Sequence, residues 1–126
     1  MYEVGVVTQF EAAHRLVGDF GPASRVHGHT FRLEVTVRGD RLDGRGTLLD
    51  VGELRAAIGD LAATLDYQDL NSVPALQGTN TTVEALAQYC WEALAARLRG
   101  HNVSALLVRL WESPQVSGAY DAPLLE

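Results

Sequence analysis

The sequence predicts an α+β fold in which one antiparallel β-sheet carries two α-helices on the same face. Two long segments in the first third of the chain alternate between apolar and polar residues, as half-buried strands do. Two later segments repeat apolar residues at helical spacing, and two shorter segments that favour strands close the chain. The expected order is therefore strand–strand–helix–helix–strand–strand, within a single domain that covers residues 1–126.

The first expected strand begins at Tyr2 and ends at His14. Its even positions form a mostly apolar face, made of Tyr2, Val4, Val6, Thr8, Phe10, Ala12 and His14. A loop with two glycines and a proline follows, and a second strand is expected from about His27 to Arg38. The odd positions of that strand are His27, His29, Phe31, Leu33, Val35 and Val37, whereas its even positions are polar. The period of two thus gives each strand an apolar face that carries histidine at one end.

Two helices are expected after a turn-rich segment that ends near residue 46. The first begins at Asp50, where Asp50 and Glu53 have the spacing of a reciprocal capping box. Its apolar stripe is Val51, Leu54, Ile58, Leu61 and Leu65. The second helix begins at the segment Thr81-Thr82-Val83-Glu84, and Gly100 is placed to end it. Its apolar stripe is Val83, Leu86, Ala87, Cys90, Leu94 and Leu98.

The last two strands are expected at about 103–112 and 116–121, joined by a turn at 113–115. Two helices can cover only one face of the resulting sheet, so its other face and its edges stay open. The open face would carry the polar residues of the second strand. We expect oligomerisation to join sheet edges into a closed barrel, with the open face toward its interior or toward solvent.

The composition excludes several classes of protein. The chain is globular in composition, with 47% hydrophobic and 21% charged residues, and its net charge is −6. An acidic chain without a basic run is not expected to bind nucleic acid, although single arginines can bind a phosphorylated small molecule. One cysteine excludes an intrachain disulfide framework. Without a signal-like or membrane-spanning segment, a soluble cytoplasmic protein with no membrane partner is expected.

Three histidines form the first candidate site. His27 and His29 are two residues apart in a strand, so both rings project to the same side. If the first two strands pair through the intervening loop, His14 lies beside them. Three neutral histidines with an open fourth position are a catalytic arrangement for Zn²⁺. The alternative is that these are ordinary histidines at strand ends.

Glu112 is the second candidate, because it ends a strand on the side of apolar residues. It is either an exposed charge at a strand end or an anchor for a ligand with two parallel N–H donors, as on pterins and guanines. The remaining residues of interest have ordinary explanations. Cys90 is expected in the core, His101 in an exposed loop, and Trp91 and Trp111 in packing roles.

The chain resembles the pyruvoyl-tetrahydropterin and carboxytetrahydropterin synthase family along nearly its whole length. The matching segments, in order, are "FEAAHRL", "HGHTFRLEVTV", "LLDVGELRA", "LDYQDLN", "TNTTVEALA" and "VRLWES". The resemblance implies the tunnelling fold or T-fold, in which subunit sheets join into a barrel as a trimer or hexamer. It also implies Zn²⁺ held by His14, His27 and His29, and a pterin substrate bound by Glu112, Thr81 and Thr82.

The same resemblance exposes two missing catalytic groups. Members of the family remove a substrate proton with a cysteine thiolate, assisted by an aspartate–histidine pair. Ala23 or Gly21 stands where the cysteine is expected, and Tyr67 stands where the histidine is expected. The candidate replacements are Asp19, Ser24, Asp66, Tyr67 and Asp69. Among these, Asp66 and Asp69 are favoured as bases, with Tyr67 as an acid or a packing aromatic.

Three functions stay open on these grounds. The first is a zinc-dependent pterin lyase or synthase that acts on dihydroneopterin, its triphosphate or a related pterin, with altered proton-transfer residues. The second is a zinc protein that binds a pterin-like ligand without turnover. The third is a zinc enzyme that uses the same site on a different substrate.

Overall fold

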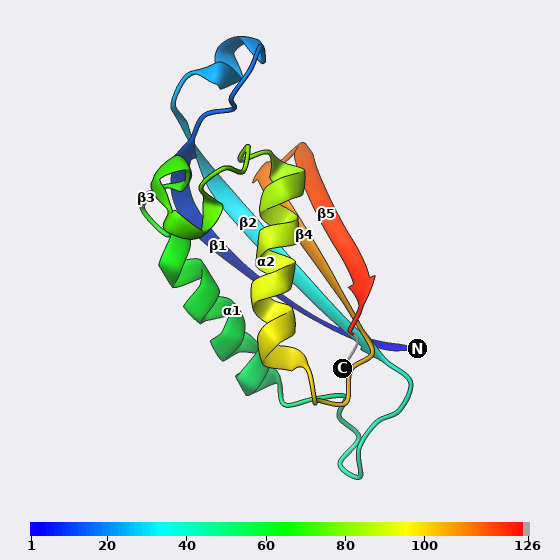
Figure 1. Cartoon of the computed structure of the whole chain (residues 1–126). Helices are drawn as coiled ribbons and strands as arrows, with labels where there is room; N and C mark the ends of the chain where they lie inside the picture. The colour runs from blue at the N-terminus through cyan, green and yellow to red at the C-terminus, as the bar shows by residue number, and fades with distance from the viewer. Residues whose placement is uncertain (125–126) are drawn as a thin grey trace.

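The computed structural model describes residues 1–124 and has the expected order of long elements, with one short strand added (Figure 1). The strands and helices are β1 (Tyr2–His14), β2 (His27–Gly39), α1 (Val51–Leu65), β3 (Gln68–Asp69), α2 (Val83–Leu98), β4 (Ala105–Ser113) and β5 (Val116–Pro123). Three short 3₁₀ turns occupy η1 (Gly21–Ser24), η2 (Leu70–Ser72) and η3 (Pro74–Leu76). Neither α1 nor α2, the two α-helices of the described residues, is long and apolar enough to cross a membrane.

The strands form one sheet in the order β3-β1-β2-β4-β5. Strands β1 and β2 pair antiparallel over their whole length, from Tyr2 opposite Gly39 to His14 opposite His27. Strand β3 pairs parallel with the edge of β1 over two residues, with Gln68 opposite Ala12 and Asp69 opposite Ala13. This strand was not predicted, because two residues are too few to show a hydrophobic alternation.

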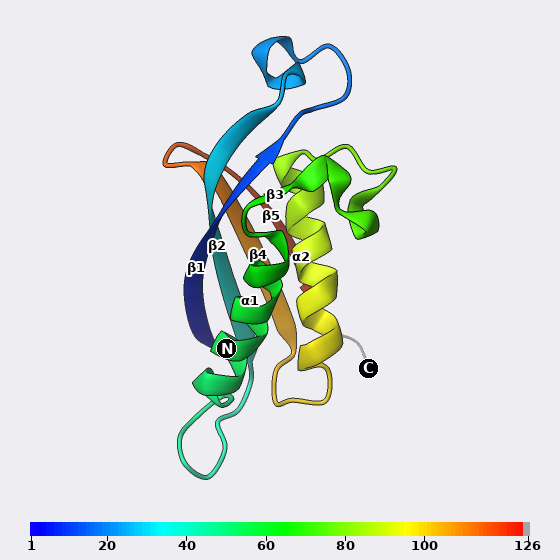
Figure 2. The same ribbon diagram turned by 90° about the vertical axis from the view of Figure 1, so that its left-hand side faces the viewer.

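Both helices cover the same face of the sheet, as predicted (Figures 1 and 2). The central strand β2 buries its odd positions against them, and Phe31, Leu33, Val35 and Val37 are each 0% exposed. The helix stripes are buried as expected except at Val51, which is 44% exposed. Val51 is the first residue of α1, so it lies at the exposed end of the helix, before the part that packs against the sheet.

The helix caps are simpler than predicted. Asp50 accepts a hydrogen bond from Gly52 N at 2.9 Å, while the Glu53 carboxylate lies 3.6 Å from His101 Nδ1. Thr82 caps α2 by accepting from Ala85 N. After α2 the chain turns at Gly100, whose φ of 90° favours glycine.

The two tryptophans lie on opposite sides of the sheet. Trp91 packs in the core between α2 and the sheet, where its Nε1 donates to Leu106 O at 2.7 Å. Trp111 is only half-buried. It points to the face of β4 opposite the one that its neighbours Leu110 and Glu112 turn toward the helices. The prediction of a packing role is therefore right for Trp91, whereas Trp111 stands on the open face.

Candidate metal centre

His14, His27 and His29 converge at one end of the β1–β2 hairpin. His14 and His27 are direct register partners, and His29 follows on the same face of β2. Their ring centroids are separated by 4.6 Å, 5.1 Å and 4.8 Å. One nitrogen of each ring lies within 4.8 Å of the other two, so the three side chains can hold one metal ion. The predicted convergence of the three histidines is confirmed.

Backbone carbonyls fix two of these rings. His14 is 1% exposed, and its Nδ1 lies 2.8 Å from Thr81 O. His27 Nδ1 lies 2.7 Å from Arg25 O. Because a carbonyl oxygen only accepts, each Nδ1 must carry the proton, which leaves the lone pair of Nε2 available. This is the usual arrangement of histidine ligands and the carbonyls that orient them.

Two Nε2 atoms of the group lack a hydrogen-bond partner among the described residues. His14 Nε2 and His29 Nε2 are buried and make no hydrogen bond to the residues that the structure describes. Buried nitrogens without partners are rare, because they lose their interaction with water and gain nothing in return. A bound cation would satisfy both, so the residues present fit the metal that the sequence predicts.

Burial also favours the neutral rings that a metal requires. Burial lowers the pKa of His14, and the hydrogen bond with Thr81 O opposes that shift only in part. Burial likewise lowers the pKa of His29, against the opposing charge of Glu112. Both rings are therefore held in the state that binds a cation without first releasing a proton.

Glu112 lies beside the three histidines. Its Oε2 is 3.9 Å from His29 Nε2, and its side chain is about one-quarter exposed. Strand β4 brings it there at the point where its register with β5 shifts, between Trp111 and Ser113. A carboxylate with lone pairs still open to solvent can accept hydrogen bonds from a ligand at this point.

Thr81 lies behind His14, with 0% exposure. Its carbonyl accepts from His14 Nδ1, and its hydroxyl donates to Arg15 O at 3.2 Å. Thr82 is half-buried and caps α2. The structure therefore places Thr81 against one of the three histidines, whereas Thr82 is seen only as a helix cap, and substrate binding by either threonine stays a prediction.

The expected proton-transfer residues make hydrogen bonds that hold the backbone. Asp66 follows α1, and its Oδ1 accepts from Glu11 N at 2.9 Å. Asp69 Oδ1 accepts from Asn71 N at the start of η2. Tyr67 lies between them with φ 56°, and its side chain is mostly exposed. These contacts fix the turn that joins α1 to the sheet.

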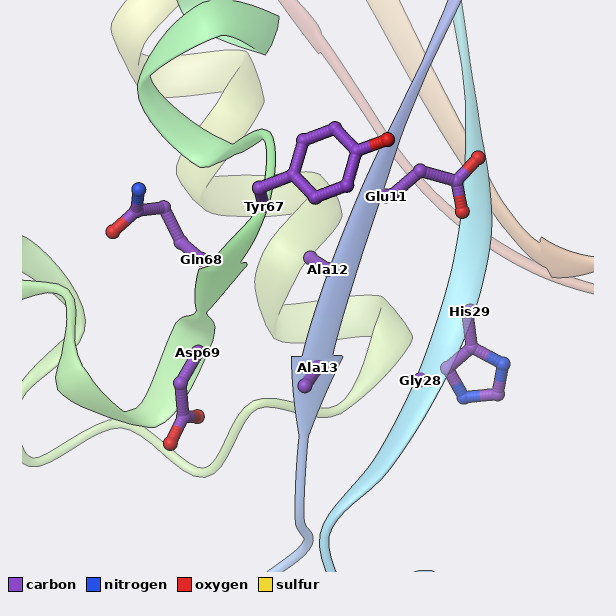
Figure 3. Close-up of a pocket in the computed structure, with 8 residues that line it drawn as sticks. All are labelled: Glu11, Ala12, Ala13, Gly28, His29, Tyr67, Gln68 and Asp69. Atoms are coloured by element: carbon purple, nitrogen blue, oxygen red, sulfur yellow. The ribbon is translucent and has the colours of Figure 1, made fainter.

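A hollow of about 370 Å³ collects part of this set. It is lined by Glu11, Ala12, Ala13, Gly28, His29, Tyr67, Gln68 and Asp69 (Figure 3). In Figure 3 the Tyr67 ring reaches across β1 toward Glu11. Asp66 does not line this hollow. Glu11 was not predicted, since it occupies an ordinary polar position of β1; its carboxylate accepts from Thr30 Oγ1 at 2.7 Å.

The other candidates lie in the loop between β1 and β2, and the cysteine lies in the core. Ser24 Oγ donates to Gly18 O and accepts from Phe20 N, so it holds the loop that contains η1. Asp19 is exposed in the same loop, which extends beyond the helices (Figure 2). Cys90 is in the core, as predicted, and burial raises the pKa of its thiol to about 12.

Comparison with known proteins gives the same family over almost the whole chain. A family model for 6-pyruvoyl tetrahydropterin synthase matches residues 3–123. A 6-pyruvoyl tetrahydrobiopterin synthase of Dictyostelium discoideum is 30% identical over 102 residues, which cover 71% of this chain and 76% of that protein. A dihydroneopterin monophosphate aldolase of Pyrococcus furiosus is 31% identical over 103 residues, which cover 82% of each chain.

The fold agrees with that of a solved relative. The 6-pyruvoyl tetrahydropterin synthase of Caenorhabditis elegans superposes with a TM-score of 0.83, covering 96% of this chain and 95% of that one at 24% identity. This likeness confirms the predicted T-fold subunit, with its antiparallel sheet and two helices on one face. The match of the family model over residues 3–123 shows that the chain belongs to the 6-pyruvoyl tetrahydropterin synthase family.

Proposed function

We propose that this chain is a zinc-dependent pterin lyase of the tetrahydropterin synthase type, acting on dihydroneopterin or a phosphorylated form of it. The observation that carries this proposal is the group of three histidines beside the Glu112 carboxylate, in which two buried Nε2 atoms make no hydrogen bond to the described residues. The names of the relatives support a pterin substrate, since they include a tetrahydrobiopterin synthase and a dihydroneopterin monophosphate aldolase.

In this proposal His14, His27 and His29 hold Zn²⁺. When bound, such an ion supplies Lewis-acid polarisation of substrate oxygen atoms. Thr81 O and Arg25 O keep two of the rings oriented through their Nδ1–H groups. We assign to Thr81 this orienting role, in addition to the substrate contact that the sequence predicts.

Glu112 would fix the pterin ring. Two carboxylate oxygens match two parallel N–H donors, which the pterin ring presents on its amino-lactam edge. The position of Glu112 next to His29 supports this role, because one end of a ligand could contact the carboxylate while another end reaches the metal. Thr82 follows Thr81, whose carbonyl contacts His14, and would line the pocket that holds the pterin ring.

Proton transfer would be carried by Asp66, Tyr67 and Asp69 in place of the absent thiol and histidine. Tyr67 and Asp69 line the same hollow as His29, which supports their participation. Asp66 Oδ1 is occupied by Glu11 N, so any proton would be accepted by its second oxygen. A carboxylate that lies close to the substrate can act as a general base, and a phenol as a general acid.

We also propose that the active form is a homo-oligomer, a trimer or a hexamer. The sheet exposes one whole face, and its outer strands β3 and β5 leave two open edges. Joining these edges between copies would close the sheets into a barrel. Light scattering coupled to gel filtration tests this proposal, and a stable monomer at micromolar concentration would contradict it.

The alternative is a zinc protein that binds a pterin without turnover. It is favoured by Ala23, Gly21 and Tyr67, which replace the groups that move protons in the family. The test is to incubate the zinc-loaded protein with dihydroneopterin, its monophosphate and its triphosphate, and to follow products by mass spectrometry.

A released product supports the enzyme, while tight binding without product supports the alternative. Glu112→Ala should weaken ligand binding in either case, whereas Glu92→Ala on the exposed side of α2 should not. If no pterin binds and Glu112→Ala changes nothing, a different substrate is indicated.

A further inference from the structure

A second hollow lies on the open face of the sheet, on the side opposite the three histidines. It has a volume of about 320 Å³. Its lining consists of Gln9, Thr30, Arg32, Trp111, Ser113 and Pro114. Consecutive strand residues point to opposite faces, so Trp111 faces this hollow while Glu112 faces the metal site. A ligand here would be separate from a ligand at the histidines.

Three of these residues form a row across neighbouring strands. Gln9 is the register partner of Arg32, and Arg32 is the register partner of Trp111. Adjacent strands are about 4.8 Å apart, so the row extends over about 10 Å. That length suits a flat bicyclic ring lying across the strands.

One carboxylate holds two of the row's side chains in place. Trp111 Nε1 donates to Glu34 Oε1 at 2.8 Å, and Arg32 Nη2 lies 3.3 Å from the same oxygen. The indole N–H is therefore fixed by a hydrogen bond before a ligand arrives, and the exposed guanidinium is drawn to the same carboxylate. Preordered side chains lose less conformational freedom on binding.

The groups that remain unused define the ligand. The side-chain amide of Gln9 makes no hydrogen bond to the described residues, so it offers an acceptor and a donor side by side. Arg32 uses one nitrogen toward Glu34 and keeps further N–H donors. Thr30 Oγ1 donates to Glu11, which leaves its hydroxyl oxygen as an acceptor. The indole face of Trp111 can stack on a planar ring.

We propose that this hollow binds a planar heterocycle with a lactam edge, stacked on Trp111. A lactam places a C=O beside an N–H, which matches the donor and acceptor of the Gln9 amide. Arg32 donates to a further ring acceptor. Such an edge occurs on guanine nucleotides and on pterins, and the two sources are separated by experiment. This binding site is independent of the metal and of the proposed reaction.

The test uses Trp111 fluorescence in a Trp91→Phe protein. Trp91 and Trp111 are the two tryptophans of the chain, so this variant reports on the hollow alone. Guanosine 5′-monophosphate should quench the signal saturably at millimolar or lower concentration, and ribose 5-phosphate should not. Neopterin is tested by equilibrium dialysis with Glu112→Gln protein, in which the site beside the histidines is weakened.

Point variants connect binding to the row. Gln9→Leu and Arg32→Gln should each weaken binding at least tenfold. Arg109→Gln is the matched control, because Arg109 lies on the same face in the next row and its Nη1 donates to Ser117 Oγ. If Trp91→Phe fails to fold, isothermal titration calorimetry on the unmodified chain and on the same variants replaces fluorescence.

The outcomes decide the assignment and the source. Binding by the nucleotide, by neopterin or by both supports a lactam heterocycle and names its origin. Equal binding of ribose 5-phosphate would reveal an anion site and overturn the assignment. Absence of binding by both heterocycles, or binding that survives in Gln9→Leu and Arg32→Gln, would overturn it as well.

Discussion

The three histidines and the 66–69 turn lie close together at one end of the sheet, but their polar groups are used in opposite ways. At the histidines, backbone carbonyls contact the Nδ1 atoms of His14 and His27, while the buried Nε2 atoms of His14 and His29 make no hydrogen bond to the described residues. At the turn, Asp66 and Asp69 accept hydrogen bonds from backbone N–H groups. The histidines thus keep ring nitrogens free to bind a ligand, whereas the carboxylates of the turn hold the backbone in place.

This difference bears on how the chain departs from its family. A metal site of this kind would need only three side chains on two strands; all three are present, and backbone carbonyls orient two of them. The proton-transfer group needs carboxylates with free lone pairs, and here Asp66 also connects the end of α1 to β1, while Asp69 caps η2. A change of reaction in such a chain is therefore expected in the proton-transfer residues before the metal ligands.

The largest expected effect comes from removing a metal ligand. His27→Ala should lower metal affinity by more than the ~10–100-fold typical of residues that only orient a ligand. Metal content after dialysis against a chelator measures this. His101→Ala is the control, because His101 is exposed and lies apart from the three histidines. Full metal occupancy in His27→Ala would show that His27 is not a metal ligand and would contradict the assignment of the three histidines.

Asp66 can be tested for structure and chemistry separately. Asp66→Ala should lower the free energy of unfolding by ~1–3 kcal/mol, because the partly buried Glu11 N loses its acceptor. Asp66→Asn keeps an acceptor oxygen and should lose much less, as measured by urea denaturation. If the Asp66→Asn protein also keeps full turnover, the role of Asp66 is only structural. If this protein folds normally but has a lower turnover rate, Asp66 has a chemical role as well.

Thr81→Val should weaken metal binding without removing a metal ligand. The valine leaves Arg15 O without the hydroxyl donor and loosens the segment whose carbonyl orients His14. An affinity loss of about tenfold is expected in a chelator competition assay. Thr82→Val is the matched control, since it removes a helix cap and should lower stability with little change in metal affinity. Equal metal affinities in both variants would show that Thr81 does not orient His14.

The smallest effects are expected at Tyr67. Its φ of 56° is unfavourable for a residue with a side chain. Tyr67→Gly should therefore raise the free energy of unfolding, by about 1 kcal/mol at most. Tyr67→Phe removes only an exposed hydroxyl and should leave the unfolding free energy within about 0.5 kcal/mol. A loss of turnover in Tyr67→Phe at unchanged stability would assign the hydroxyl a role in proton transfer. Unchanged turnover would leave it a surface aromatic.

Most of the fold could be predicted because its long elements have regular periods. The alternation in β1 and β2 placed His14, His27 and His29 on one face, and the helical stripes placed both helices on the sheet. Strand β3 lacked such a period, and the exposure of Val51 depends on how far the helix end extends past its neighbours. Similarly, the cap spacing of Glu53 did not show that His101 lies nearby.

By itself, the sequence determined which side chains share a face, because the geometry of a strand or helix is repeated every two or 3.6 residues. That was enough to assemble the three histidines, while the absent thiol followed from the resemblance to a known family. The tertiary structure decided which polar atoms remain free. Thr81 contacts His14 from 67 residues away, and Asp66 contacts Glu11 from 55 residues away. Hydrogen bonds over such separations leave no local pattern, so only the folded chain shows which groups they occupy.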